Sequence, residues 1–225
     1  MERPFDIQLE KLKTKLYKMC SLVDEQVDYA IKSLEDINPE LAKIVLERDS
    51  KVDKYDDKIE RVCQKLFALN QPVAMDLRYV MSALKINTNL ERLGDLSVNI
   101  AHLSIEINEP QEIYRKINFS EISYLTKFMI KNAIDSFIRI DAELARQVLT
   151  TEDKLDDLIR TAGDSIVLKM KQDGNFVEQG LKIYSVLQEM ERLGDHATNI
   201  SEEVYFIVKA QSIKHRTDDF DDIDE

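Results

Sequence analysis

Four pairs of acidic side chains recur in this chain at a spacing of four residues, which places the two members of each pair on one face of a helix. Carboxylates at this spacing repel each other and cost about 0.2–0.5 kcal/mol per pair. A cation held between such pairs would offset the repulsion, and hard ions such as Mg²⁺, Mn²⁺, Ca²⁺ or ferric iron prefer carboxylate oxygens. The pairs are Asp49 with Asp53, Glu91 with Asp95, Glu152 with Asp156, and Glu191 with Asp195.

The pairs fall into two sets because the chain carries the same pattern twice. Residues 89–101, NLERLGDLSVNIA, and 189–201, EMERLGDHATNIS, share E-R-L-G-D-x-x-x-N-I at an offset of 100 residues. Residues 38–49, NPELAKIVLERD, align with 141–152, DAELARQVLTTE, at an offset of 103, and each opens on a residue type that caps helices. Such self-similarity predicts an internal duplication.

Helical geometry predicts that the repeated acids face away from the core. At about 100° per residue, with Leu93 as the reference, Glu91 falls at about 160°, Asp95 at about 200° and Asn99 at about 240°. The apolar stripe of the same helix centres at about 20°. That stripe consists of Ile86, Leu90, Leu93, Ser97 and Ile100.

The last helix repeats this arrangement with Glu191, Asp195 and Asn199. In each half, the remaining acidic pair lies on the helix that precedes the E-R-L-G-D helix. If neighbouring helices pack antiparallel, their acidic pairs meet across a groove and four carboxylates converge on one spot. We therefore expect a cation site in each half, with Asn99 and Asn199 as weaker candidate ligands.

Plainer explanations stay open for single features of this pattern. A solvated polar face explains any one acidic pair at less cost than a metal does, although four matched pairs are harder to explain in this way. Gly94 and Gly194 each cost about 1 kcal/mol relative to alanine inside a helix. Either close helix packing or room for a metal-bound water shell accounts for them, and the two are compatible.

Histidine and cysteine give no separate indication of a metal site. Zinc prefers these ligands in a closed shell, but the counterparts of His102 and His196 in the other half are a glutamate and a leucine, so we treat both as incidental. No Glu-x-x-His segment occurs, which disfavours a ferritin-type di-iron core. Cys20 and Cys63 lie inside helical patterns and are expected to be buried thiols in a reducing compartment.

The elements that carry these residues are expected to be long helices. The chain has 225 residues, 44% of them hydrophobic, with five glycines, four prolines and no tryptophan, which leaves little turn chemistry for many strands. Apolar residues recur at spacings of three, four or seven, as in helical bundles. We predict an all-α fold of six long helices in two similar three-helix bundles, related by an approximate twofold axis.

The predicted domain limits follow from the duplication. The first bundle covers residues 1–110 and the second covers residues 111–213, with QDGNF at 172–176 as the break before the last helix. Residues 214–225 are acidic and lack periodicity, so we expect a disordered tail.

Charge and hydropathy narrow the possible partners. A formal net charge of −12 disfavours nucleic acid and anionic membrane surfaces, because both attract basic patches. The first residues interleave charged with apolar side chains, unlike a signal peptide, and no apolar run approaches the roughly 20 residues that cross a bilayer. We therefore expect a cytoplasmic protein without membrane insertion.

The repeated motifs resemble those of the PhoU family, the cytoplasmic regulators of bacterial phosphate uptake. The resemblance rests on QPVAMDLRYVMSALKINTNLERLGDLSVNIA and EMERLGDHATNISEEV, and it extends over about residues 3–210. It implies two three-helix bundles that bind metal clusters, with iron or zinc in some members and Mg²⁺ or Mn²⁺ in others. It carries the ligands over to Asp49, Asp53, Glu91, Asp95, Glu152, Asp156, Glu191 and Asp195.

The same resemblance implies partners. Members of the family restrain the phosphate-responsive histidine kinase and associate with the ATPase of the phosphate ABC transporter, and we expect a homodimer. Asp76 and Arg78 have no counterpart in the second half, where Phe176 and Glu178 stand. They form either a partner-binding feature or an acidic first helical turn with a local ion pair.

The expected function is that of a non-enzymatic adaptor, a negative regulator of phosphate uptake and of the phosphate-starvation response. The chain contains no Walker A sequence, no glycine-rich phosphate loop and no plausible catalytic triad. Two alternatives remain open. One is a metal-dependent phosphohydrolase built on the carboxylates, and the other is a metal-free helical scaffold.

Overall fold

The computed structural model of the chain describes residues 4–107, 111–211 and 213, and the regular elements within these ranges are all helices. The predicted all-α class is therefore confirmed. The acidic segment 214–225 lies outside the described residues. In chain order the helices are α1 (Pro4–Glu35), α2 (Pro39–Asn70), α3 (Ala74–Glu106), α4 (Gln111–Lys116), α5 (Phe119–Arg139), α6 (Ala142–Leu149), α7 (Glu152–Gln172), the short 3₁₀ helix η1 (Gly174–Phe176) and α8 (Val177–Lys209).

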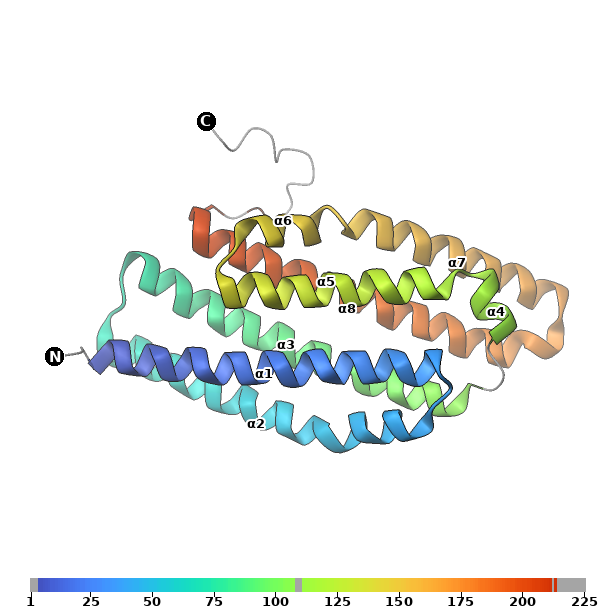
Figure 1. Cartoon of the computed structure of the whole chain (residues 1–225), viewed down its shortest axis with the longest axis horizontal. Helices are drawn as coiled ribbons and strands as arrows, with labels where there is room; N and C mark the ends of the chain where they lie inside the picture. Colours follow the sequence, from blue (N-terminus) through green and yellow to red (C-terminus); the bar gives the residue numbers. More distant parts are fainter. Residues whose placement is uncertain (1–3, 108–110, 212, 214–225) are drawn as a thin grey trace.

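The helices pack in two groups that follow the two halves of the chain. Helices α1, α2 and α3 pack on one another, and α5, α6 and α7 each pack against α8. The groups meet mainly where α3 lies along α8, with a smaller contact of α1 on α5 (Figure 1). Helices α2 and α3 run antiparallel, as the predicted convergence of their acidic pairs requires (Figure 1). The twofold relation and the limits 1–110 and 111–213 stay predictions.

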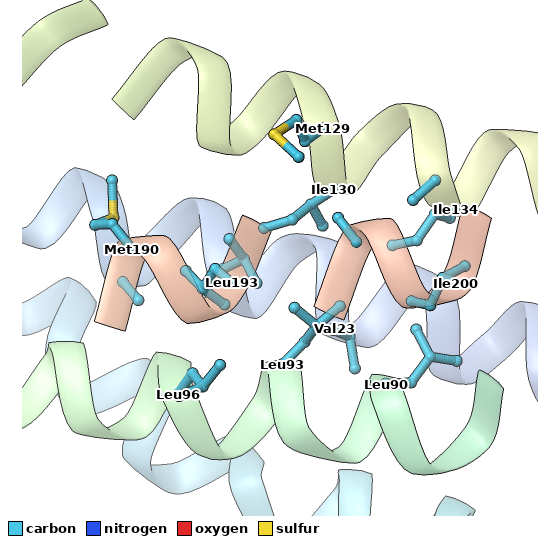
Figure 2. Packing of buried hydrophobic residues seen from close by; sticks show 14 of the residues in the cluster. Val23, Leu90, Leu93, Leu96, Met129, Ile130, Ile134, Met190, Leu193 and Ile200 are labelled. Carbon is cyan, nitrogen blue, oxygen red and sulfur yellow. The ribbon is translucent and has the colours of Figure 1, made fainter. Parts of the chain in front are cut away.

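The predicted apolar stripes form the core. Leu90, Leu93 and Ile100 of α3 and Met190 and Leu193 of α8 are fully buried. Figure 2 shows Leu90, Leu93 and Leu96 of α3 facing the α8 row, with labelled side chains of α1 and α5 beside them. Buried residues from both groups of helices belong to one continuous cluster, so the two halves share a single core.

Two interruptions distinguish the structure from six uninterrupted helices. Where α2 is continuous, the matching part of the second half is divided into α6 and α7. The hydroxyl groups of Thr150 and Thr151 both donate to the Gln147 carbonyl, at 3.2 and 2.7 Å, which offers the backbone an alternative to helical bonding. The fourth expected helix is divided at Asn118, which has φ 53°, a conformation that ends a helical run.

Helix ends and thiols agree with the sequence. Asn38 caps α2 by accepting from Glu40 N at 3.1 Å, and Asp141 caps α6 by accepting from Glu143 N at 2.9 Å. Cys20 and Cys63 are free and buried, as predicted. Throughout the described ranges, no helix combines the length and apolarity needed to cross a membrane.

Candidate functional site

The two glycines of the repeated motif allow neighbouring helices to approach closely. A Cβ added to Gly94 on α3 would lie 3.2 Å from Val52 Cγ1 on α2. In the second half a Cβ on Gly194 would lie 2.8 Å from Leu155 Cδ2 on α7. In the sequence, Val52 lies between Asp49 and Asp53, and Leu155 lies between Glu152 and Asp156. The contacts with the glycines therefore bring the acidic pairs of neighbouring helices close to each other. Helix packing thus accounts for both glycines.

The first acidic cluster consists of Asp49 and Asp53 from α2 with Glu91 and Asp95 from α3. Burial raises the pKa of Asp49, and repulsion from Asp53 and Asp95 raises it further. Burial also raises the pKa of Glu91, with added repulsion from Asp95 and Asp53. Each of these two carboxylates is affected by charges on the facing helix, so the two pairs lie near each other, while their convergence on a cation stays a prediction.

An arginine partly neutralises this first acidic cluster. Arg92 Nη1 lies 3.1 Å from Asp95 Oδ2, and Arg92 Nε lies 3.5 Å from Glu91 Oε2. The Arg92 side chain is 54% exposed, so solvent screens these ion pairs, and they contribute only about 0–1 kcal/mol to stability. A cation that bound the carboxylates would meet only weak competition from Arg92.

The second acidic cluster consists of Glu152 and Asp156 from α7 with Glu191 and Asp195 from α8. Burial raises the pKa of Glu152 to about 7, against the effect of the neighbouring Thr198 hydroxyl, and repulsion from Asp156 and Asp195 adds to the shift. Burial raises the pKa of Asp156, and repulsion from Glu191 and Asp195 follows. Here too the carboxylates of the two helices repel one another.

Five of the eight acids are partly buried beside a helix contact, whereas Asp53, Glu191 and Asp195 are exposed. Glu91 and Asp95 are partly buried, although their helical angle placed them opposite the core. The reason is that α2 packs against the side of α3 that a helical wheel leaves to solvent. Asn99 is exposed and donates to Glu189 Oε2 at 3.3 Å, and Asn199 is partly buried.

The chemistry of the donors fits a hard cation better than their present arrangement does. All eight acids offer oxygen ligands, and the buried Gln26 side chain donates a hydrogen bond to Asp49 of the first cluster. However, within the described ranges, no three His, Cys, Asp or Glu side chains are placed so that they could hold a metal ion. Ion binding would therefore need side-chain rotation about backbone positions that already face each other.

The segment with no counterpart in the second half begins α3. Asp76 lies in the first turn, where a carboxylate favours the positive end of the helix dipole. Arg78 is partly buried, and its Nε has no hydrogen-bond partner. A local pair through this nitrogen is therefore not formed, and the partner-binding role of Asp76 and Arg78 stays a prediction.

The histidines are separate from the acidic pairs. His196 Nδ1 lies 2.8 Å from Asn89 Oδ1 across the contact of α8 with α3. Burial lowers the pKa of His196, and the nearby positive charges of Arg192 and Arg92 lower it further. His102 is exposed on α3.

Sequence reasoning missed two buried polar residues. Glu203 on α8 is 3% exposed and accepts from Ser82 Oγ at 2.9 Å and Lys85 Nζ at 2.8 Å, both on α3. Gln26 on α1 is fully buried behind the first acidic cluster. The available signal was a polar residue inside an apolar stripe, between Val23 and Val27 in the case of Gln26.

Comparison with known proteins identifies the family. The PhoU domain model matches residues 16–104 and 119–204. The phosphate-specific transport system accessory protein PhoU homolog of Pseudomonas putida is 32% identical over 96% of this chain and 84% of its own length. The accessory protein PhoU of Escherichia coli is 28% identical over 94% of this chain and 88% of its own length.

A solved structure gives the same result. The crystal structure of PhoU from Pseudomonas aeruginosa superposes with a TM-score of 0.88 at 32% identity, covering 92% of this chain and 100% of that chain. The two matched segments of the family model fall one in each half of the chain, and each contains one of the acidic clusters. The chain therefore belongs to the PhoU domain family.

Proposed function

We propose that this chain is a non-enzymatic accessory protein of phosphate-specific transport. The supporting observation is the match to PhoU accessory proteins along 96% of the chain, with both family segments present. The relatives are named as accessory proteins of a transport system, which is the class of protein that binds other components rather than turning over a substrate.

The finer proposal is a negative regulator that works in the cytoplasm as a homodimer. In this proposal the protein links the ATPase subunit of the phosphate ABC transporter to the phosphate-sensing histidine kinase and lowers the starvation response when phosphate is plentiful. Asp76 and Arg78, at the start of α3, are the proposed contact residues, because they belong to a segment that only the first half has.

Deletion of the gene in its own organism tests the regulatory role. With abundant phosphate, alkaline phosphatase activity and transporter expression should rise in the deletion strain and return to normal when the intact gene is restored. Complementation with Asp76→Ala/Arg78→Ala tests the contact residues separately. Unchanged expression in the deletion strain at high phosphate would rule out negative regulation.

We also propose that the two acidic clusters each hold hard metal ions such as Mg²⁺, Mn²⁺ or iron, with zinc as a further candidate. A bound cation would stabilise the charged form of carboxylates that burial disfavours and that also repel one another, the two causes of the raised pKa values of Asp49, Glu91 and Glu152. Elemental analysis of protein purified without a chelator or a metal-affinity tag tests this, with Asp95→Ala/Asp195→Ala as the variant expected to lose stoichiometric metal.

A further inference from the structure

Helices α1 and α5 form the smaller contact between the two halves of the chain, and they run antiparallel (Figure 1). Val27 of α1 and Ile130 of α5 meet in this contact, since both are buried and both line a small groove between the two helices. The other residues of the groove are charged. They are Asp24, Glu25 and Asp28 from α1 and Lys127 and Lys131 from α5. The groove therefore brings acids of one half together with lysines of the other.

The two helices occupy corresponding places in the two halves. Residues 27–42, VDYAIKSLEDINPELA, align with residues 130–145, IKNAIDSFIRIDAELA, at an offset of 103. The backbone agrees with this alignment, because Ile37 and Ile140 have φ values of 50° and 53°, so the chain leaves both helices through the same left-handed conformation. The residues that meet at the centre of the contact, Val27 and Ile130, are therefore equivalent positions of the two halves.

The charges that flank this centre are opposite in the two halves. At the same offset Asp24 corresponds to Lys127, and Asp28 corresponds to Lys131. A helix rises about 1.5 Å per residue, so in an antiparallel contact centred on the two aliphatic residues Asp24 and Lys131 differ by about 3 Å along the helix axis. The same count applies to Asp28 and Lys127 on the other side of the centre. Each acid of α1 thus has a lysine of α5 at nearly its own level.

Interactions across the contact agree with this arrangement. Burial raises the pKa of Asp24, the positive charge of Lys131 opposes that rise, and the like charge of Asp135 on α5 adds to it. Lys127 Nζ lies 3.1 Å from Glu35 Oε2 on α1, and the two side chains are 30% and 28% exposed. Both lysines of α5 therefore interact favourably with acids of α1.

We propose that the charges of Asp24, Asp28, Lys127 and Lys131 select the pairing of unlike halves, α1 with α5, and disfavour the pairing of like halves between copies of the chain. In the same antiparallel register, two copies of α1 would place Asp24 of one copy beside Asp28 of the other. Two copies of α5 would place lysine beside lysine. Such like-charge contacts reject a wrong partner at a contact whose apolar centre is aliphatic in both halves.

Charge reversal in the full chain, followed by urea unfolding, tests the selection. Asp24→Lys/Asp28→Lys and Lys127→Asp/Lys131→Asp should each lower the folding equilibrium constant, because each makes the contact repulsive. The exchanged protein, which carries all four substitutions, should be at least about tenfold more stable than the sum of the two losses predicts. Losses within α1, such as the pair of Asp28 with Lys32 at 2.8 Å, occur in the reversed and the exchanged protein alike and cancel from this coupling. If a reversed protein does not fold, return of the helical circular dichroism signal in the exchanged protein gives the same comparison.

A matched control uses two lysines on another side of α1. Lys11 and Lys15 line a separate groove between α1 and α2. Lys11→Asp/Lys15→Asp combined with Asp24→Lys/Asp28→Lys should give additive losses, because at least nine residues, about 13 Å of helix, separate the two sets of charges. The coupling between the α1 and α5 reversals should also shrink in about 1 M NaCl, which screens partly exposed charges.

The assembly of a neutral variant tests the rejection of like halves. Asp24→Asn/Asp28→Asn/Lys127→Gln/Lys131→Gln removes the four charges and keeps polar side chains in their places. After refolding from urea, the wild type and the exchanged protein should have the same mass by native mass spectrometry, whereas the neutral variant should form additional, larger species. Additive losses from the two reversals would overturn the selective pairing of α1 with α5. A neutral variant that assembles like the wild type would overturn the rejection of like halves.

Discussion

Gly94 on α3 lies against Val52 on α2 so closely that an added Cβ would sit 3.2 Å from Val52 Cγ1. Val52 stands beside Asp53, and Gly94 stands beside Asp95. Because Gly94 has no side chain, α2 and α3 can approach closely, and this approach determines the distance between the acids of the two helices. A residue that costs helix stability is retained at a contact that determines the geometry of the first acidic cluster.

Gly94→Ala should destabilise the protein despite the better helix propensity of alanine. The new methyl meets a β-branched side chain with little rotational freedom, and overpacking of this kind costs about 1–3 kcal/mol against a propensity gain of about 1 kcal/mol. Urea unfolding of Gly94→Ala, Val52→Ala and the double variant measures the coupling. Because Val52→Ala makes room for the methyl, the double variant should be more stable than the sum of the single effects predicts. Simple additivity would contradict the contact.

Glu203 should stabilise the contact between the two halves. It is 3% exposed, and its carboxylate bonds Ser82 and Lys85 on α3. Glu203→Ala should lower the free energy of unfolding by about 1–3 kcal/mol, because it leaves a buried hydroxyl group without its partner. Chemical denaturation measures this loss. Asp57→Asn, which removes the exposed pair with Arg61, is the matched control and should change stability little.

Glu152 should make the metal-free protein less stable as pH rises. Burial raises its pKa from the ordinary 4.5 to about 7, so between these values the folded state holds a proton that the unfolded state has lost. Folded protein that binds more protons loses stability with rising pH. Compared with Glu152→Gln in chelator, the wild-type protein should therefore lose more stability between pH 5 and pH 8.

The sign of this pH effect has an internal control. Arg146 lowers the pKa of Glu143, which is the opposite direction. Any contribution of Glu143 is present at neutral pH and is lost as pH falls, so Glu143→Gln should not reproduce the effect of Glu152→Gln. Parallel pH profiles for wild type and Glu152→Gln would show that the carboxyl group titrates normally.

Much of the fold followed from periodicity, because the α3 and α8 stripes each bury one face against the same core. The proximity of acids on α2 and α3 follows from their antiparallel packing, whereas the cation sites inferred from the duplication stay predictions. Periodicity could not predict which residue of another helix, or of a neighbouring turn, each residue would contact. The reason for Gly94 depends on Val52, 42 positions earlier in the chain, and the α6–α7 break depends on two threonine hydroxyl groups bonding Gln147.

Cys20 and Cys63 should be inert to thiol reagents in the folded protein. Burial raises the pKa of each thiol to about 12, and neither residue has exposed surface. Only the thiolate reacts, so at pH 8 labelling by an aromatic disulfide should be roughly a thousandfold slower than for a free cysteine. The rate should rise with urea in step with unfolding. Rapid labelling of native protein would show that α1 or α2 opens locally.

Arg92 should compete with a cation for the first acidic cluster. Its guanidinium pairs with Asp95 at 3.1 Å and Glu91 at 3.5 Å, and both pairs are partly exposed. In Asp195→Ala, which leaves the acids of the first cluster intact, Arg92→Ala should tighten Mn²⁺ binding by up to about fivefold, since it removes a competing charge worth about 0.2–1 kcal/mol. Arg61→Ala removes an equal charge that pairs with Asp57 instead, and serves as the control. If Arg92→Ala weakens binding, the arginine positions the carboxylates for the ion rather than competing with it.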